Sequence, residues 1–247
     1  MDLSSFLTAK RLENVTVLDK TDSTNTQLKK MNDAKHGTVI IANEQTAGRG
    51  RYNRRFHSPK GGLYLSYLYV GKSSDTVYLT AVCGVIVKRA IERVCGVNLD
   101  IKWVNDLLLN GKKVCGILAE TVYTGEKHRT VIGLGINCGD KNSIFPDEIK
   151  DVATSVYNET GIIPDKRRLC SEIIKMLDGI DTLDRDEIFK EYKKNCITLG
   201  KKVRAVSQEN TCDGEILGIN PDFSLEFLSE NGEKKRIYTG EISVKQR

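Results

Sequence analysis

The stretch TVYLTAVCGVIVKRAIERVCG, residues 76–96, carries the strongest structural signal in the chain. Its apolar residues recur at intervals of three and four over about five turns, which predicts an amphipathic helix over residues 76–95. Gly96 directly follows this pattern and is a typical helix stop. The stretch therefore predicts a long helix with one buried face, formed by Leu79, Val82, Cys83, Ile86, Val87, Ala90, Ile91 and Val94.

A β-hairpin is the clearest signal after the helix. Leu107–Leu109 and Lys113–Val122 are separated by Asn110-Gly111, a pair that accepts the positive φ angles of a two-residue turn. Apolar runs bounded by turn residues predict further strands, and amphipathic periodicity predicts further helices. The strands are expected over Val39–Ala42, Leu63–Val70, Asn98–Val104 and, after a turn at Gly125, Thr130–Cys138, and the helices over Asp22–Met31 (capped by Asp22 or Ser23), Asp165–Ile180 and Asp184–Cys196.

The character of the sequence changes near Leu199-Gly200. From there on it holds only short candidate strands, separated by the turns Asn220-Pro221-Asp222 and Asn231-Gly232. Strands this short and closely spaced predict a small β-barrel. We therefore expect two domains, residues 1–199 and residues 200–247. The strands expected in the second are Lys202–Val206, Gly214–Leu217, Ser224–Leu228, Arg236–Tyr238 and Ile242–Val244.

Composition narrows the class of protein. The chain has 247 residues and a formal net charge of +5, from 38 basic and 33 acidic side chains. This excess is too small to indicate nucleic-acid binding without a concentrated patch. The seven cysteines include no C-x-x-C pair, which argues against zinc knuckles and redox motifs and predicts reduced thiols in a cytoplasmic protein. No signal peptide or membrane-length apolar stretch is present in the sequence.

A concentrated basic patch does occur in residues 48–60, GRGRYNRRFHSPK. The segment has five basic side chains and no acidic one, and its two glycines free the backbone to bend. The fork of donors on arginine matches phosphate and carboxylate oxygens, so the segment is a candidate anion site. A loop that only maintains solubility, or that binds nucleic acid weakly through charge, fits the same residues.

A second basic segment occupies residues 102–120. Asn105-Asp106 follows a predicted strand, and Lys112-Lys113 follows the hairpin turn. A lysine beside a phosphate can stabilise a developing oxyanion, and either Asp106 or Glu120 can bind Mg²⁺. A surface hairpin with solvated lysines explains the same spacing. The two interpretations stay open at this point.

Several common catalytic motifs are absent from the sequence. Without a G-x-x-x-x-G-K-[ST] loop the chain is not a P-loop NTPase, and it has no G-x-S-x-G nucleophile elbow. Gly133-Leu134-Gly135 lacks the third glycine of a dinucleotide fingerprint. Only three histidines are present, His36, His57 and His128, which leaves few candidates for a His-based triad.

Blocks of residues spread in order over nearly the whole chain form a joint pattern. They are Asp22-Ser23-Thr24-Asn25, Glu44–Arg51 with Ser58-Pro59 and Leu65-Ser66, Lys102-Trp103-x-Asn105-Asp106, Lys113-x-x-Gly116-Ile117-Leu118-x-Glu120, Gly133–Asn137 and Gly240-Glu241-Ile242-Ser243. This pattern resembles the biotin protein ligase family, also called biotin–acetyl-CoA-carboxylase ligases. The chain departs from it at Asn53, Phe56 and Val104, where the family usually has Gly, Trp and Pro; none of these is a charged catalytic position.

The resemblance implies a fold and a reaction. The fold is α+β: a mixed-sheet catalytic domain with helices on one face, followed by a small SH3-like β-barrel. The reaction uses ATP, Mg²⁺ and biotin to form biotinyl-5′-AMP, and then transfers biotin to a lysine of a biotin carboxyl carrier protein or domain. We expect no DNA-binding module before Ser23, no specific DNA binding and no membrane association. The oligomeric state stays open, a homodimer included, as do the binding order and the carboxylase served.

The resemblance also implies roles for individual residues. Lys113 and Arg51 are the expected catalytic residues, and Asp106 is the expected metal ligand. The residues expected to bind biotin are Ser23, Thr24, Asn25, Gln45, Gly48, Arg49 and Gly116. Those expected to bind ATP or the adenylate are Arg51, Arg54, Phe56, Trp103, Asn105, Lys113 and Asn137.

Two rival functions remain at the level of sequence. A lipoate ligase would share the superfamily and the adenylate chemistry, but the Gly48-Arg49-Gly50-Arg51 loop and the Gly240–Ser243 tail speak against it. A non-enzymatic nucleic-acid binder would use the arginine loop alone. The region from Lys201 onward, with equal numbers of basic and acidic residues, argues against this second rival.

Overall fold

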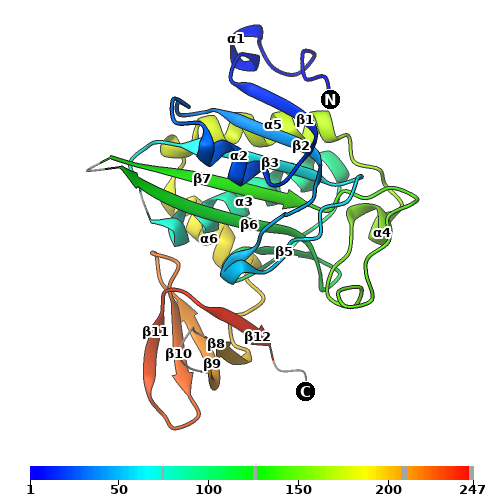
Figure 1. Ribbon diagram of the computed structural model, residues 1–247. Coiled ribbons are helices and arrows are strands. Elements are labelled where there is room, and N and C mark those ends of the chain that lie inside the picture. Colours follow the sequence, from blue (N-terminus) through cyan, green and yellow to red (C-terminus); the bar gives the residue numbers. More distant parts are fainter. Residues whose placement is uncertain (74, 125–126, 207–210, 245–247) are drawn as a thin grey trace.

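Two β-sheets organise the chain. The computed structural model describes residues 1–73, 75–124, 127–206 and 211–244. Figure 1 shows a large mixed sheet with helices around it and a smaller sheet at the C-terminal end. The large sheet has seven strands in the order β1-β2-β3-β7-β6-β5-β4, of which only β1 and β2 run parallel. Its strands are β1 (Val15–Thr21), β2 (Val39–Gln45), β3 (Leu63–Tyr69), β4 (Asp100–Lys102), β5 (Asp106–Leu109), β6 (Lys112–Thr124) and β7 (Lys127–Ile136).

The long helix is confirmed over the predicted residues. Helix α3 spans Thr76–Cys95 and packs against β6 and two other helices, α5 (Lys166–Asp178) and α6 (Arg185–Asn195). The carboxylate of Asp75 accepts hydrogen bonds from the backbone N–H groups at the start of α3, and Gly96 ends the helix at a φ of +69°. Asp165 and Asp184 cap α5 and α6 in the same way. These caps explain why the predicted helix starts hold to within a residue or two.

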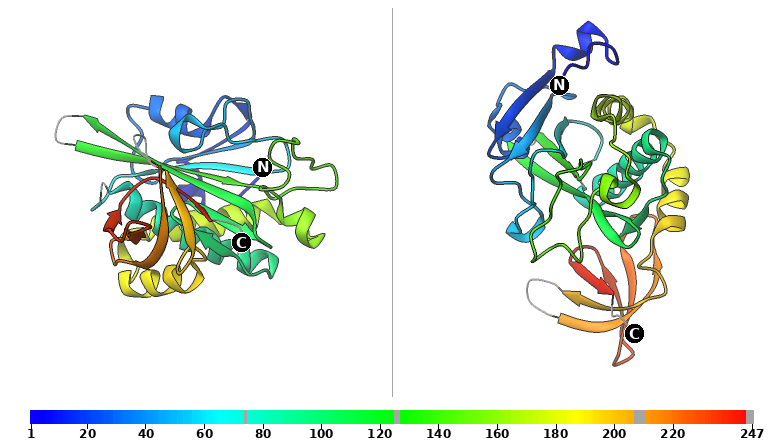
Figure 2. Two further views of the ribbon diagram at one scale, coloured as in Figure 1. Left: turned by 90° about the horizontal axis from the view of Figure 1, so that it is seen from below. Right: turned by 90° about the vertical axis from the view of Figure 1, so that its right-hand side faces the viewer.

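A helix also covers the other face of the sheet. Helix α2 (Thr24–Lys30) packs over β2, β3 and β7, opposite α3 and α5 (Figure 2, left). Leu28, Ile40, Leu68 and Val131 form a separate core there, because adjacent strand residues point to opposite faces. The expectation of helices on one face only is therefore wrong, and β3 is buried on both sides.

Other differences from the sequence-based expectations are local. Strand β1 was not predicted, nor were the one-turn helices α1 (Ala9–Leu12) and α4 (Val156–Thr160). The strand expected over Asn98–Val104 is cut to β4, and the Trp103–Val104 peptide bond beyond it is cis. The hairpin turn is confirmed, with φ of +52° at Asn110 and +81° at Gly111. The turn expected at Gly125 lies outside the described residues.

The C-terminal sheet has five antiparallel strands in the order β11-β10-β9-β8-β12. All five predicted strands are present, four of them with shifted ends. Closure into an SH3-like barrel and a domain boundary between residues 199 and 200 stay predictions. The strands are β8 (Lys202–Val206), β9 (Thr211–Ile219), β10 (Leu225–Ser229), β11 (Lys234–Ile237) and β12 (Glu241–Val244).

Phe223 joins the small sheet to the large one. It follows the predicted turn at Asn220-Pro221-Asp222, adopts a positive φ of +63°, and is only 1% exposed. Its ring meets three aromatic rings on α3 and α6, with centroid separations of 5.9, 5.8 and 5.0 Å to Tyr78, Phe189 and Tyr192. Its carbonyl accepts a 2.7 Å hydrogen bond from Trp103 Nε1. The turn between β9 and β10 of the small sheet is thereby held beside the end of β4.

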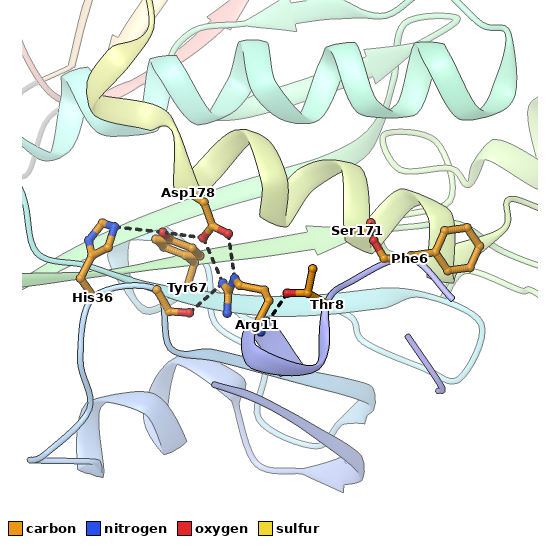
Figure 3. Close-up of polar contacts among 8 residues, drawn as sticks. Phe6, Thr8, Arg11, His36, Tyr67, Ser171 and Asp178 are labelled. Carbon is orange, nitrogen blue, oxygen red and sulfur yellow. Dashed lines mark hydrogen bonds and ion pairs between the residues drawn. The ribbon is translucent and has the colours of Figure 1, made fainter. Parts of the chain in front are cut away.

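The N-terminal segment is tied to α5 by Arg11 (Figure 3). The Arg11 guanidinium donates to both carboxylate oxygens of Asp178 at 2.7 and 3.0 Å, and to the Gly37 carbonyl at 2.8 Å. The buried Tyr67 hydroxyl donates to the same carboxylate at 3.1 Å and lies 3.2 Å from His36 Nε2. One guanidinium therefore holds together α1, the start of β2 and the end of α5.

Replacing Arg11 by methionine should lower the free energy of unfolding by about 2 kcal/mol, because hydrogen bonds to a charged partner are worth about 1.5–3 kcal/mol. Methionine keeps the apolar stem, so the loss reports on the polar contacts. The measurement is urea denaturation, with Lys10→Met on the exposed side of α1 as the control. Equal stability of the two variants would contradict this role.

Candidate active site

A cavity of about 580 Å³ opens where the middle of the large sheet meets the small one. The start of α2, the arginine-rich segment, the β5–β6 hairpin and the turn before β12 all line it. The sequence-predicted site residues meet here, although they come from segments more than 100 residues apart. Those that line the cavity are Ser23, Thr24, Asn25, Gln45, Arg49, Arg51, Arg54, Phe56, Trp103, Asn105, Asp106, Lys113, Gly116 and Asn137. Gly48 alone does not line it; its carbonyl accepts a 2.9 Å hydrogen bond from the Phe56 backbone N–H.

Glycines on two neighbouring strands form the floor. Gly116 and Gly135 are cross-strand partners, and the Phe56 ring lies directly on them. A Cβ atom at Gly135 would stand 2.6 Å from the Phe56 ring, and one at Gly116 would stand 3.0 Å from both Phe56 and the Lys113 side chain. Any side chain at Gly116 or Gly135 would occupy the space in which the Phe56 ring lies. The glycines therefore keep the floor flat enough for a planar group to lie on the backbone.

A cluster of uncharged polar groups closes one end. Gln45 Oε1 accepts from the Thr24 backbone N–H at 2.8 Å, and Gln45 Nε2 donates to Ser58 Oγ at 3.0 Å. The Ser66 hydroxyl lies 2.7 Å from Thr24 Oγ1 and 2.6 Å from Asn25 Oδ1. Gln45 is half-buried and the other members are buried, and their orientations are fixed by one another. Such a surface suits a small polar ring without net charge.

The arginine-rich segment forms the other wall. Gly50 and Arg54 pair through the backbone, and Arg51 starts a single 3₁₀ turn. Arg51 donates to Thr239 Oγ1 at 3.0 Å, and Arg54 forms a 2.5 Å ion pair with Glu241. Both partners belong to the turn and strand at the edge of the small sheet. The small sheet therefore holds the arginines at the mouth of the cavity.

Lys113 and Asp106 form an ion pair at 2.7 Å beside the Phe56 ring. The pair has the separation of a salt bridge but not the angles of a hydrogen bond, so Asp106 Oδ1 is buried without a hydrogen-bond donor among the described residues. The Lys113 ammonium lies 5.6 Å from the centre of the Phe56 ring. Lys112, its neighbour, does not line the cavity, and its Nζ donates to the Lys150 carbonyl at 3.2 Å. Alternation along β6 thus separates the two lysines.

Comparisons with known proteins agree with this site. Residues 17–137 match the model of the biotin/lipoate A/B protein ligase family. The bifunctional ligase/repressor BirA of Bacillus subtilis (strain 168) is 35% identical over 236 residues, which cover 92% of this chain and 72% of that protein. The chain belongs to the biotin protein ligase family. The biotin--[acetyl-CoA-carboxylase] ligase of Paracoccus denitrificans is 35% identical over 59% of this chain and 63% of its own length.

Solved structures of the family share the fold. The biotin protein ligase from Aquifex aeolicus in complex with biotin and ATP has a TM-score of 0.82 and 30% sequence identity to this chain. The match covers 95% of this chain and 100% of that one. The likeness therefore extends through both sheets.

Three residues expected to bind the adenylate have their polar atoms engaged elsewhere. Trp103 Nε1 donates to Phe223, Asn105 Nδ2 to the Ile117 carbonyl at 3.3 Å, and Asn137 Nδ2 to the Thr154 carbonyl at 3.0 Å. All three residues shape the wall of the cavity. A direct contact of each with nucleotide stays a prediction.

Some residues of the site were not assigned from the sequence. Ser58, Ser66 and Glu120 stood inside the blocks that resemble the family but carried no predicted biotin role. Thr239 and Glu241 at the edge of the small sheet were not expected to meet the arginine segment. Ser58 and Ser66 were signalled only by their place in those blocks, and Glu120 also as a possible Mg²⁺ ligand, because hydroxyl and carboxylate partners across strands leave no periodicity in a sequence.

Proposed function

We propose that this chain is a biotin protein ligase. It activates biotin with ATP to biotinyl-5′-AMP and then transfers biotin to a lysine of a carboxylase's carrier domain. The observation that carries the proposal is the polarity of the cavity. An uncharged polar cluster around Thr24 and Gln45 lies at one end, cationic Lys113, Arg51 and Arg54 lie at the other, and the glycine floor joins them.

The uncharged cluster fits the biotin head group. The ureido ring carries a carbonyl and two N–H groups without net charge, and buried uncharged donors and acceptors fix such a ring without stranding a charge. The valeryl chain then runs along the cavity toward Lys113, past the Phe56 ring that lies on the glycine floor. The lipoate head group is a dithiolane without these polar groups, so the cluster favours biotin over lipoate.

The cationic end fits the adenylation step. A biotin carboxylate oxygen attacks the α-phosphate, the new carboxyl–phosphate bond forms, and pyrophosphate leaves. Two anionic groups must approach each other, so positive charge between them lowers the barrier. We propose that Lys113 supplies it, and its 2.7 Å ion pair with Asp106, which orients the ammonium, supports this role.

Mg²⁺ can be accommodated at this end. It commonly binds one or two carboxylates and takes its other ligands from phosphates and water. Asp106 fits as one such ligand, because its buried Oδ1 accepts no hydrogen bond from the residues that the structure describes. When bound, the ion would neutralise the phosphates of ATP.

The transfer step needs the adenylate to be retained. The acceptor lysine attacks the mixed anhydride, the amide forms, and AMP leaves; water in the cavity would hydrolyse the same bond. Arg51 and Arg54 form the wall beside the phosphate end, and the small sheet positions them. We expect the carrier domain to approach at this mouth.

The location and the partners of the enzyme are considered next to its membrane-spanning potential. None of the helices in the described part of the chain is long and apolar enough to cross a membrane. We propose a cytoplasmic enzyme that acts without specific DNA binding. A homodimer is compatible with this function but is not required by a cavity lined from one chain.

The experiment that tests the proposal is biotin-dependent exchange of labelled pyrophosphate into ATP. It reports adenylate formation without a carrier protein. Exchange that depends on biotin and not on lipoate is expected. Absence of exchange from folded protein with both substrates would contradict the proposed function.

Replacing Arg51 by glycine should let the adenylate escape before transfer. One charge-assisted hydrogen bond is worth about 1.5–3 kcal/mol, which corresponds to a loss of retention of roughly ten- to a hundred-fold. Free adenylate then labels lysines of a bystander protein, which mass spectrometry quantifies. Lys60→Gly, at an exposed basic residue of the same segment that does not line the cavity, is the control. Bystander labelling no higher than that of wild type would count against the assigned role.

A further inference from the structure

Residues 152–154 run beside the first residues of β6, where β7 has already ended at Ile136. The Lys113 backbone N–H donates to the Val152 carbonyl at 2.9 Å, and the Lys113 carbonyl accepts from the Thr154 backbone N–H at 2.9 Å. Both main-chain groups of the proposed catalytic lysine are therefore bonded to this short segment. The position of the segment decides where the Lys113 side chain begins.

Thr154 holds this segment in place. It is only 4% exposed, and its carbonyl accepts a 3.0 Å hydrogen bond from Asn137 Nδ2. Its hydroxyl donates to Glu159 Oε1 at 2.8 Å. A hydroxyl group has a single proton, so this donation commits the Thr154 side chain to one acceptor. The Glu159 carboxylate thus fixes the residue whose backbone pairs with Lys113.

Glu159 also reaches the tip of the β5–β6 hairpin. Its second oxygen, Oε2, accepts a 2.8 Å hydrogen bond from Asn110 Nδ2. Asn110 is the first residue of the two-residue turn, and Lys113 follows it by three residues along the chain. One carboxylate therefore bridges the turn that precedes Lys113 and the segment that pairs with Lys113.

Helix α4 gives Glu159 a fixed position outside the cavity. The Ser155 hydroxyl accepts a hydrogen bond from the Asn158 backbone N–H at 3.1 Å and so caps the start of this helix. Neither Glu159 nor Thr154 lines the cavity. Glu159 can therefore act on the reaction only through the residues that it holds.

The Lys113 ammonium has a second anchor in its 2.7 Å ion pair with Asp106. A carboxylate and a phosphate that enter the cavity compete with Asp106 for the same positive charge. When they engage the ammonium, the backbone contacts are what still fix the lysine. Placement of a catalytic group matters most in the transition state, where a displacement of about 1 Å can lower the rate roughly a hundred-fold.

We infer that Glu159 is a positioning residue for the adenylation step. It fixes the backbone of Lys113 from two sides, through Thr154 and through Asn110, and with the backbone it fixes the place of the ammonium. The inference rests on the proposed function, in which Lys113 brings the biotin carboxylate and the α-phosphate together.

The experiment measures biotin-dependent pyrophosphate exchange over a range of biotin concentrations, together with urea denaturation of each variant. Thr154→Val keeps the shape of the side chain and removes its hydroxyl, and Glu159→Ala removes the carboxylate. Each should lower the maximal exchange rate by about ten-fold and change the apparent affinity for biotin by less than about two-fold. Glu159→Gln should restore most of the rate, because its amide oxygen can accept from Thr154 while the exposed Asn110 amide turns to meet its NH₂ group.

Thr38→Val is the matched control. The Thr38 hydroxyl also donates at 2.8 Å, to the Lys35 carbonyl, and Thr38 is 7% exposed and does not line the cavity. Thr38→Val should lose about as much stability as Thr154→Val and leave exchange unchanged. A second control uses the Lys113→Ala protein. There Thr154→Val should lower the remaining exchange by less than about two-fold, because the lysine that Thr154 helps to position is gone.

A maximal exchange rate equal to that of wild type in folded Thr154→Val would overturn the inference. So would a loss of about ten-fold that persists in the Lys113→Ala protein, an equal loss of exchange in Thr38→Val, or a Glu159→Gln protein no faster than Glu159→Ala. If Glu159→Ala does not fold, Thr154→Val decides the question alone. Failure of the wild-type protein to catalyse biotin-dependent exchange would instead overturn the proposed function on which the inference rests.

Discussion

Lys113→Ala is expected to lower the rate of biotin-dependent pyrophosphate exchange by about 10²–10³-fold. We propose that the biotin carboxylate and the α-phosphate converge at this lysine, which lies between Gly116 of the glycine floor and Asp106. Its charge matters most in the transition state, so the loss should fall on the maximal rate more than on the apparent affinity for biotin. Steady-state exchange over a range of biotin concentrations separates the two.

The neighbouring lysine supplies the control for this prediction. Lys112 lies outside the cavity against Lys150, so Lys112→Ala should change exchange by less than about two-fold. Lys113→Ala leaves the Asp106 carboxylate without its cation, which should cost about 1 kcal/mol or less of stability. The double variant Lys113→Ala/Asp106→Asn removes that stranded charge and should stay inactive. Equal losses in the two single variants, or full activity of Lys113→Ala, would refute the assignment.

Phe223→Ala is expected to lower the free energy of unfolding by about 3–5 kcal/mol, the usual cost of truncating a fully buried aromatic side chain. Removal of the ring would leave an empty space between α3, α6 and the small sheet, where three aromatic rings now contact Phe223. Trp103 is the only tryptophan of the chain and donates to the Phe223 carbonyl, so its fluorescence reports on this joint during urea denaturation.

Loss of the contacts around Phe223 should also disturb the active site. Thr239 and Glu241 hold Arg51 and Arg54 only while the small sheet stays docked. Phe223→Ala should therefore release adenylate as Arg51→Gly does. Tyr238→Ala, on the same sheet but 53% exposed, should change stability by no more than about 0.5 kcal/mol. Similar stability of both variants would show that Phe223 is not the anchor.

Elements whose cause is local could be predicted from the sequence. The period of apolar residues over residues 76–95 requires a buried helix face, and α3 has the predicted bounds. Asn110-Gly111 accepts positive φ at both positions, so the hairpin forms where it was expected. The motif blocks that resemble the family also led to the residues that line the cavity, because each block contains its own chemical groups whatever its place in the fold.

Elements and contacts that depend on partners far away in the sequence became apparent only in the folded chain. Strand β1 is half-exposed and shows no clear alternation of buried and exposed residues. It forms by pairing with β2, so no local sequence pattern predicts it. The partner of Asn25 is Glu120, 95 residues away, and the anchor of Trp103 is Phe223, 120 residues away. Such contacts follow from how sheets and helices pack, which spacing along the chain does not encode. For this reason the sequence identified the chemical groups of the site, while only the fold showed which of them orient the others.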